Sequence, residues 1–254
     1  MKLTILGCGT STGVPRIGPD WGECDPREPR NRRSRCALLV ESAGERLLVD
    51  CGPDIRNQLL SAAIGDLDAV VVTHDHADHC HGIDDLRPIA QRRGPVPLHA
   101  RTDVLERLRL RFDYAFAGSG FYSPVVEAVE AGEELRIGNA RIGLVDQPHG
   151  DASSLGLRIE EGTQAAAYAI DFNEMSPDMM RLYEGVDVLI CDCLQRRPHP
   201  THAHLDAVLG WAEQLRVQKL YLTHMNASMD YQSLVRDLPD WAEPAYDGLE
   251  IDLS

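Results

Sequence analysis

The sequence contains no apolar run that approaches the ~20 residues needed to cross a bilayer. It also has no signal peptide that we can recognise, because Met1 to Gly7 is too short and has the pattern of a strand. The seven cysteines are an odd number, and none of them needs a disulfide in a reducing compartment. We therefore expect a cytoplasmic protein that does not bind a membrane.

Positive charge is scarce. The chain has 25 lysines and arginines against 40 aspartates and glutamates, which gives a net charge of −15 and a pI near 5.0. Such a surface repels long RNA or DNA unless a local basic patch compensates for it, so nucleic acid is not an expected partner. The arginines that could form such a patch are Arg27, Arg30, Arg32, Arg33, Arg35, Arg92, Arg93, Arg107, Arg109 and Arg111.

The chain also lacks internal repeats, low-complexity segments and any linker that we can recognise. Its 254 residues fit one large domain or two small ones, and 43% of them are hydrophobic, which is enough for a sizeable core. We interpret residues 1–254 as a single domain.

Apolar and alternating segments predict the order strands, helices, strands, helices, which indicates an α/β fold of two facing mixed sheets with helices outside. The predicted strands are Lys2–Leu6, Ala37–Glu41, Glu45–Asp50, Ala69–Val72, Val125–Val129, Leu135–Ile137, Arg141–Val145, Leu155–Ile159, Ala165–Ile170, Val186–Cys191 and Lys219–Thr223. The predicted helices are Pro53–Ile64, Asp84–Gln91, Asp103–Phe112 with Thr102 as its cap, and Leu205–Leu215.

Three histidines and two aspartates lie within six consecutive positions, from His74 to His79, directly after a predicted buried strand. His74 and His76 are two residues apart, so an extended chain would point both to one side and Asp75 to the other. Asp78 and His79 follow where the chain turns toward a helix. Imidazole nitrogens and carboxylate oxygens are ligands for zinc, manganese or iron, so this stretch predicts a metal site.

Three further ligand-type residues each follow an apolar strand. They are His149, Asp171 and His224. Each alone is more often a cap or a surface residue, but together with His74 to His79 they supply the roughly seven ligands that a two-metal site needs. Asp50 is either a partner of a ligand histidine or a turn residue before Gly52. We assign no role to His81 or His99.

The signature His74-x-His76-x-Asp78-His79 resembles that of the metallo-β-lactamase superfamily. Other segments are similar to its PhnP-like branch, which contains the phosphodiesterase of the carbon–phosphorus lyase pathway and is distantly related to tRNase Z. These segments are Leu6-Gly7-Cys8-Gly9-Thr10-Ser11, Gly13-Val14-Pro15, Asn31-Arg32-Arg33-Ser34-Arg35, His199-Pro200-Thr201-His202 and Leu222-Thr223-His224.

The resemblance implies an αββα sandwich with two divalent ions, Mn²⁺ or Zn²⁺, at one edge between the sheets. It implies that one ion is held by His74, His76 and His149, and the other by Asp78, His79 and His224. Asp171 would bridge the two ions. The resemblance also suggests a homodimer.

Cleavage of a phosphodiester requires a general acid that protonates the leaving oxygen. His199, His202 and His204 crowd the loop before the helix Leu205–Leu215. We choose His202 from the match of Pro200-Thr201-His202, with His204 as the alternative, and we interpret His199 as a cap or surface residue. The candidate catalytic residues are therefore Asp78, His202 and His204.

We interpret the chain as a binuclear metal-dependent phosphodiesterase that acts on small phosphodiesters, cyclic ones included. The alternatives are a tRNase Z-like nuclease, a thioester or lactone hydrolase, and a metal-binding module without activity. Arg32, Arg33 and Arg35 either contact phosphate oxygens or pair with acidic residues under the long loop.

The chain departs from the PhnP-like pattern at a separate structural zinc site. Three cysteines in the loop after the first strand and a histidine three residues after the last metal-binding histidine hold that zinc in the family. Here Pro19, Trp21 and Ala227 stand at three of the four positions, and only Cys24 remains. One thiolate cannot hold zinc in tetrahedral geometry, so we expect no structural zinc and a loop that is ordered by packing around Trp21.

Overall fold

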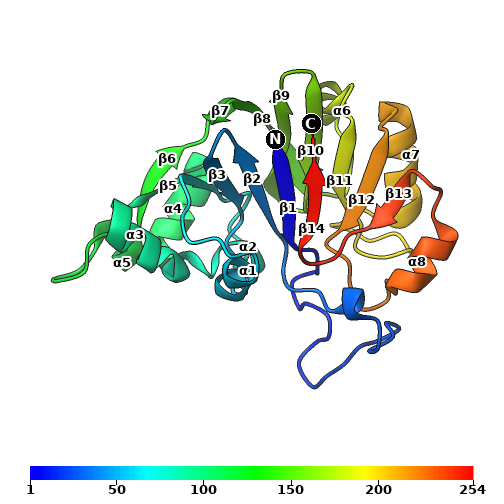
Figure 1. Cartoon of the computed structure of the whole chain (residues 1–254), viewed down its shortest axis with the longest axis horizontal. Coiled ribbons are helices and arrows are strands. Elements are labelled where there is room, and N and C mark those ends of the chain that lie inside the picture. Colours follow the sequence, from blue (N-terminus) through cyan, green and yellow to red (C-terminus); the bar gives the residue numbers. More distant parts are fainter. Residues whose placement is uncertain (254) are drawn as a thin grey trace.

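Two seven-stranded sheets form the centre of the molecule, seen in a computed structural model that describes residues 1–253 (Figure 1). The first sheet has the order β14-β1-β2-β3-β4-β5-β6, and the second has the order β13-β12-β11-β10-β9-β8-β7. The strands of the first sheet are β1 (Lys2–Gly7), β2 (Ala37–Ser42), β3 (Glu45–Val49), β4 (Ala69–Val71), β5 (Val96–Ala100), β6 (Val126–Glu130) and β14 (Leu249–Asp252). Those of the second are β7 (Glu134–Ile137), β8 (Ala140–His149), β9 (Ala152–Glu161), β10 (Gln164–Ala169), β11 (Val188–Asp192), β12 (Lys219–Thr223) and β13 (Ala242–Pro244).

Each sheet joins an antiparallel half to a parallel half. In the first sheet the pairs from β14 to β3 are antiparallel and those from β3 to β6 are parallel. In the second sheet the pairs from β7 to β10 are antiparallel and those from β10 to β13 are parallel. The predicted pair of mixed sheets is confirmed, and parallel strands bring their carboxyl ends to a common edge, where sites are usually built.

The largest apolar core contains side chains from both sheets, because successive residues of a strand point to opposite faces. On β2, Leu38 and Val40 belong to this core together with Leu157 and Ile159 of β9. The intervening Leu39 belongs to a second core on the outer side of the first sheet. Each fully buried aliphatic side chain contributes roughly 1.5–3 kcal/mol, so the two sheets are held firmly against each other.

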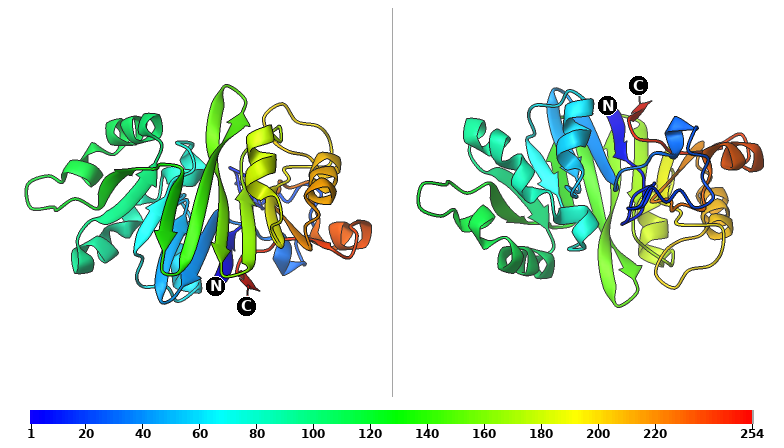
Figure 2. Two further views of the ribbon diagram at one scale, coloured as in Figure 1. Left: turned by 90° about the horizontal axis from the view of Figure 1, so that it is seen from above. Right: turned by 90° about the horizontal axis from the view of Figure 1, so that it is seen from below.

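Helices cover the outer sides of both sheets (Figures 1 and 2). Beside the first sheet lie α1 (Ile55–Ser61), α3 (Arg87–Arg93), α4 (Thr102–Arg111) and α5 (Asp113–Ala117), and beside the second lie α6 (Pro177–Tyr183), α7 (Leu205–Leu215) and α8 (Tyr231–Asp237). The short helices are η1 (Pro29–Asn31), α2 (Ala77–Cys80) and η2 (Ile83–Leu86). Among residues 1–253, no helix has both the length and the apolar character needed to cross a membrane.

Some predicted boundaries hold and others are wrong. α7 and β12 begin and end where the sequence pattern places them. The predicted cap Thr102 is the first residue of α4, and its Oγ1 donates to Glu130 Oε1 at 2.6 Å instead of capping the helix. The helix predicted over 53–64 is shorter, and the segment 84–91 divides into η2 and α3.

The sequence analysis missed several elements and shortened others. β5, β13, β14, α5, α6 and α8 were not predicted, and the hairpin of β8 and β9 extends well beyond the two segments predicted for it. The added residues of β8 include Gln147 and Pro148, which are paired with Ser154 and Ser153 of β9. These pairs extend the hairpin as far as His149, so the length of the hairpin decides where His149 lies.

Candidate metal centre

The signature stretch follows β4 and brings four donor side chains to one edge of the sandwich. His74 and His76 lie in the extended segment after β4, and Asp78 and His79 lie on the short helix α2. His74 Nε2 and His76 Nδ1 are 2.9 Å apart, so the two rings face the same space as the alternation of an extended chain predicts. His79 Nε2 lies 3.2 Å from Asp78 Oδ2.

The second sheet contributes the remaining donors from the ends of its strands. His149 is the last residue of β8, Asp171 follows β10, and His224 follows β12. His74 and His149 have ring centroids 5.3 Å apart. Two groups of donor atoms result, each within 4.8 Å of one another: His74, His76 and His149 in the first, and Asp78, His79, Asp171 and His224 in the second.

The Asp171 carboxylate lies between these two groups. Its Oδ2 is 2.6 Å from His79 Nε2 and 3.3 Å from His74 Nε2, and its Oδ1 is 3.1 Å from His224 Nε2. Asp171 and His224 have φ angles of 49° and 56°, a left-handed backbone conformation that costs a non-glycine residue of order 1–3 kcal/mol. Such strain is commonest where the surrounding structure fixes a functional side chain.

Neighbouring groups orient three of the histidine rings through contacts with the Nδ1 atom of each ring. Thr73 Oγ1 lies 3.0 Å from His74 Nδ1, Asp50 Oδ2 lies 2.7 Å from His79 Nδ1, and the Thr201 carbonyl lies 2.8 Å from His149 Nδ1. Each contact directs Nε2 of that ring into the common space, which is how metal-binding histidines are usually held. Of the two roles left open for Asp50, partner of a ligand histidine is the one that these contacts support.

The donor set fits divalent metal ions. Within residues 1–253, several buried atoms in this space approach a carboxylate or an imidazole but make no hydrogen bond of acceptable angle: His79 Nε2, Asp171 Oδ1 and His224 Nε2. Leaving such groups unpaired costs roughly 1–3 kcal/mol each, and a cation that accepts their lone pairs removes that cost. Five imidazoles and two carboxylates match the ligands of zinc and manganese.

Burial and neighbouring charges set the protonation of these groups. Burial lowers the pKa of His74 well below its usual value, so this ring is in its neutral, ligand form. Burial raises the pKa of the Asp171 carboxyl, but the charges of His224 and His79 outweigh it and hold that pKa well below its usual range. The site therefore keeps a carboxylate and at least one neutral imidazole side by side.

His202 lies at this centre and His204 does not. His202 Nδ1 is 3.0 Å from Asp192 Oδ2 and 3.3 Å from Asp171 Oδ1. Burial lowers the pKa of His202, but the neighbouring carboxylates of Asp171 and Asp192 outweigh that effect and raise the pKa to about 10. His204 is the residue before α7 and does not line the metal pocket, and His199 lies behind His202 with ring centroids 5.2 Å apart.

Asp192 is a site residue that the sequence analysis missed. It is the last residue of β11 and fully buried, and its Oδ1 lies 3.6 Å from His224 Nδ1 while its Oδ2 holds His202. The sequence did contain a signal, because Asp192 directly follows an apolar strand in the same way as Asp171 and His224. The predicted strand simply stopped one residue earlier, at Cys191.

A pocket of about 490 Å³ opens over the donors. Besides donor residues it contains groups from the long loop after β1, the β8–β9 turn and the loop before α7. Its lining is Ser11, His76, Asp78, His149, Gly150, Asp151, Ala152, Asp171, Thr201, His202 and His224.

Several of the arginines considered for a basic patch pair with acidic residues away from the donors. Asp75 points away from the donors, and its carboxylate is held by Arg107 Nε at 2.9 Å and Arg111 Nη2 at 2.5 Å. Arg93 pairs with Asp66 and Asp68. These contacts offset the positive charge that would be needed to attract a polyanion.

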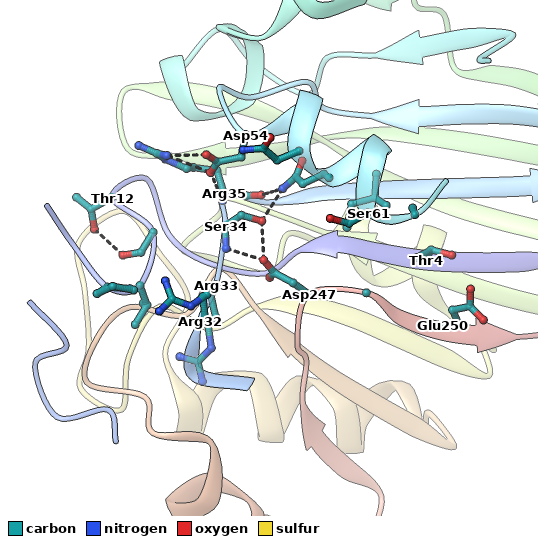
Figure 3. A pocket seen from close by; sticks show the side chains of 18 residues that line it. Thr4, Thr12, Arg32, Arg33, Ser34, Arg35, Asp54, Ser61, Asp247 and Glu250 are labelled. Carbon is teal, nitrogen blue, oxygen red and sulfur yellow. Dashed lines mark hydrogen bonds and ion pairs between the residues drawn. The ribbon is translucent and has the colours of Figure 1, made fainter. Parts of the chain in front are cut away.

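Arg32, Arg33 and Arg35 line a separate groove of about 690 Å³ beside α1, not the metal pocket (Figure 3). Arg35 Nη1 pairs with Asp54 at 3.0 Å, and its Nε donates to the Ser11 carbonyl at 3.1 Å. Of the two roles left open for these residues, structural pairing is the one that the contacts show for Arg35 and, through backbone carbonyls, for Arg33.

The loop that carries the zinc cysteines in the PhnP-like pattern is packed here around apolar side chains. Val14, Cys24 and Ala227 form a small buried cluster, and the half-buried Trp21 packs against it. Burial raises the pKa of the Cys24 thiol and so favours its protonated form.

Comparison with known proteins agrees with this geometry. The model of the family described as "Beta-lactamase superfamily domain" matches residues 45–225. A diphosphatase from the PhnP family, known from a crystal structure, has a TM-score of 0.89 and 36% identity over 98% of this chain and 96% of its own. The human short-form tRNase Z has a TM-score of 0.74 at 17% identity over the whole of both chains, which shows the fold alone.

Curated relatives match over part of their own length. An octanoyltransferase from Porphyromonas gingivalis is 31% identical over 256 residues, which cover 98% of this chain and 51% of that protein. A ribonuclease Z from Methanopyrus kandleri is 32% identical over 141 residues, covering 52% of this chain and 46% of that protein. The chain thus spans about half the length of these two relatives. Because the family model matches well over half of the chain, and a PhnP-family structure shares its fold from end to end, the chain belongs to the beta-lactamase superfamily of metal-dependent hydrolases and is PhnP-like within it.

Proposed function

We propose that this chain is a binuclear metal-dependent phosphodiesterase that hydrolyses small phosphodiesters, cyclic ones included. The observation that carries the proposal is the position of His202. It lies beside the shared carboxylate Asp171 at 3.3 Å and lines the same pocket as the donors. A proton donor at this distance from a two-metal site is what the departure of an alkoxide requires. The similarity to a diphosphatase of the PhnP family supports hydrolysis at a phosphorus centre.

In this proposal His74, His76 and His149 would hold one divalent ion, Asp78, His79 and His224 would hold the other, and Asp171 would be a ligand shared by both. When bound, Mn²⁺ or Zn²⁺ would supply positive charge that lowers the pKa of water toward neutrality and offsets charge on phosphate oxygens. The Nδ1 contacts of Thr73, Asp50 and Thr201 keep the ring nitrogens of their histidines aimed at the ions.

His202 is the general acid of the proposal. Its Nδ1 is fixed by Asp192, so its Nε2 is the atom that would carry the proton to the leaving oxygen. Because Asp192 is fully buried and also approaches His224, it holds the acid at a constant position relative to the donors. His204 lies outside the pocket lining, which favours His202 over it for this role.

Two rivals from the sequence analysis remain. A tRNase Z-like nuclease would have to bind a polyanion, and the ion pairs of Arg107 and Arg111 with Asp75 and the net charge of −15 argue against it. A thioester hydrolase has less need of a proton donor such as His202, because a thiolate leaves more readily than an alkoxide. A lactone hydrolase is the other form of this rival.

A substrate panel on metal-reconstituted protein tests the proposal. It contains bis-p-nitrophenyl phosphate, a 2′,3′-cyclic nucleotide, a cyclic ribosyl phosphate, a thioester and a tRNA precursor. We expect turnover of the phosphodiesters and little turnover of the thioester or the tRNA precursor. Efficient cleavage of the thioester or of the precursor alone would contradict the proposal and favour the corresponding rival.

We also propose that the protein forms a homodimer and works in the cytoplasm. The dimer follows from the resemblance to PhnP-like proteins, and light scattering coupled to size-exclusion chromatography tests it. The cytoplasmic location is supported by seven free, buried thiols, which are usual in a reducing compartment.

A further inference from the structure

The lining of the metal pocket has an unusual charge composition. Apart from the donors and His202 it contains only one ionisable residue, Asp151, and none of the 25 lysines and arginines of the chain contributes to it. Sites that bind phosphate groups commonly include such a residue, because guanidinium and ammonium groups pair well with phosphate oxygens. Among the lining residues outside the donors and His202, Asp151 is therefore the one charge that can act on a substrate at this mouth.

The backbone of Asp151 is held firmly at the mouth. Gly150 and Asp151 form a two-residue turn, because the flanking His149 and Ala152 are paired in the β8–β9 ladder. Gly150 has a φ of 60°, which a glycine at the first position of a tight hairpin turn adopts without strain. A Cβ added to Gly150 would lie 2.9 Å from Thr201 Cγ2, so the turn packs closely against the loop that carries His202.

The Asp151 side chain is exposed. It has no ion pair within residues 1–253, and His202, a candidate cation in the same lining, pairs with Asp171 and Asp192 instead. A substrate phosphate that reaches the donors at the floor of the pocket has to place its second substituent toward the mouth. That substituent then lies in the field of one negative charge.

We propose that Asp151 selects substrates by the charge of the second substituent on the phosphodiester. A cationic substituent, such as a quaternary ammonium or an amine, is favoured, a neutral one is accepted, and an anionic one is disfavoured. This inference rests on the proposed function, since it names the class of phosphodiester that the same site takes. It also gives a local reason, beyond net charge, why a polyanion is a poor ligand here.

Three p-nitrophenyl phosphodiesters test the inference, because they share one leaving group and differ only in a choline, an ethyl or a 2-carboxyethyl substituent. Asp151→Asn should lower kcat/KM for the choline ester by about two- to fivefold, raise it for the carboxyethyl ester by a similar factor, and leave the ethyl ester nearly unchanged. Asp151→Lys should reverse the order of the two charged substrates. Both effects should shrink as salt is raised, because exposed charges are screened over about 10 Å at 0.1 M ionic strength.

Asp240→Asn is the matched control. It removes the same charge from an exposed position that lies outside the metal pocket, so the ratios among the three substrates should not move. If Asp151→Asn changes all three substrates by one common factor, or none of them, the inference is wrong.

A binding measurement tests the role of Asp151 without relying on catalytic turnover. Titration calorimetry on the metal-loaded protein compares phosphorylcholine with phosphoglycolate. We expect wild type to prefer phosphorylcholine, and Asp151→Asn to weaken that preference by the same factor as in the kinetic series. Absence of turnover with an intact preference would contradict the proposed function alone, whereas an equal affinity of wild type for both ligands would contradict the inference.

Discussion

The Asp171 carboxylate approaches donors of both groups, with Oδ2 2.6 Å from His79 Nε2 and Oδ1 3.1 Å from His224 Nε2. Its side chain is buried, and its left-handed backbone is fixed by Ser154, whose Oγ donates to the carbonyls of Ile170 and Asp171. We therefore expect Asp171→Ala to abolish turnover and to lower the content of both metal ions, because each loses the carboxylate that they share. Elemental analysis of the purified variant measures the loss.

Asp75→Ala is the control for this variant, because Asp75 lies between two candidate ligands in the sequence but points to Arg107 and Arg111. It should retain most of the metal, although the loop loses its anchor on α4. Equal metal losses in the two variants would show that the assignment of ligands is wrong.

His202 gives a second prediction at the residue scale. If it protonates the leaving oxygen, His202→Ala keeps both metal ions but loses on the order of 10²–10⁴-fold in rate on substrates with an alkoxide leaving group. The loss should be much smaller with p-nitrophenolate, which departs without proton transfer. Parallel kinetics on both kinds of substrate measure the difference.

Two outcomes would remove His202 from this role. Equal losses on both kinds of substrate would argue against proton donation. Loss of metal would point instead to the third group of donors that the fold brings together, in which His202 and Asp192 join Asp171 and His224. His204→Ala is the matched control and should change neither property, because His204 lies outside the pocket.

The placement of donors shows what one sequence can reveal at this scale. The His74 to His79 stretch is compact, so local spacing alone indicates a site. His149, Asp171 and His224 come from three strands far apart in the chain, and they were found because each follows an apolar run. Asp192 was not predicted as a site residue, because its role depends on two contacts, to His202 and His224, that exist only in the folded protein.

At the scale of elements, several hydrogen bonds join the long loop from Gly9 to Arg35 to the segment after β12, and one buried arginine contributes two of them. Arg33 is 1% exposed, its Nη2 donates to the Met229 carbonyl at 2.6 Å, and its Nη1 lies 3.5 Å from the Asn226 carbonyl. These carbonyls follow His224 closely. A fixed positive charge here joins the same two segments that a structural zinc would join in the PhnP-like pattern.

We expect Arg33→Ala to destabilise the fold by about 3 kcal/mol or more, because it leaves buried carbonyls unpaired and opens a cavity. The neighbouring Arg32→Ala should cost no more than about 0.5 kcal/mol, since Arg32 is exposed and only approaches the Trp21 ring, 5.1 Å from its centroid. Urea denaturation of both variants measures the difference. Similar stabilities for the two would mean that Arg33 does not hold the loop.

The local pattern of apolar and polar residues predicts a helix or strand well only where that pattern alone determines which element forms. α7 has buried residues at Leu205, Val208, Ala212 and Leu215, a helical spacing that is legible in the sequence, and its bounds were predicted correctly. β5 contains Pro97 and His99, and β14 alternates with Glu250 and Asp252, so neither resembles a buried strand. Both become strands through their neighbours in the folded sheet: β5 pairs with β4 and β6, and β14 pairs with β1 at the other end of the chain.

At the scale of the whole molecule, the site depends on both sheets. β4 brings one set of donors from the first sheet, and β8, β10 and β12 bring the other from the second, so the distance between the sheets sets the distance between the donors. The shared apolar core fixes that distance.

Repulsion between carboxylates works against the packing of the two sheets at this edge. Four aspartates are buried near one another there, in a chain of net charge −15: Asp50, Asp78, Asp171 and Asp192.

Divalent cations that offset these carboxylates should therefore stabilise the entire fold, since a ligand that binds only the native state adds to the free energy of unfolding. Chelation should lower the Tm by on the order of 10 °C, and readdition of Mn²⁺ or Zn²⁺ should restore it. Asp171→Ala serves as the control, because a variant that has already lost its ions should not respond to the chelator. An equal shift in this variant would mean that the stabilising ions bind elsewhere.

The number of metal ions bound per chain can also be predicted. The native protein should hold two ions per chain, and Cys24→Ser should leave that number and the chelator response unchanged, because Cys24 lies among Val14, Ala227 and Trp21 with no further thiol or imidazole in that cluster. A third, tightly held zinc that disappears in Cys24→Ser would contradict this. It would show that the packed loop recruits metal ligands from outside the cluster, and that Arg33 does not replace the structural zinc.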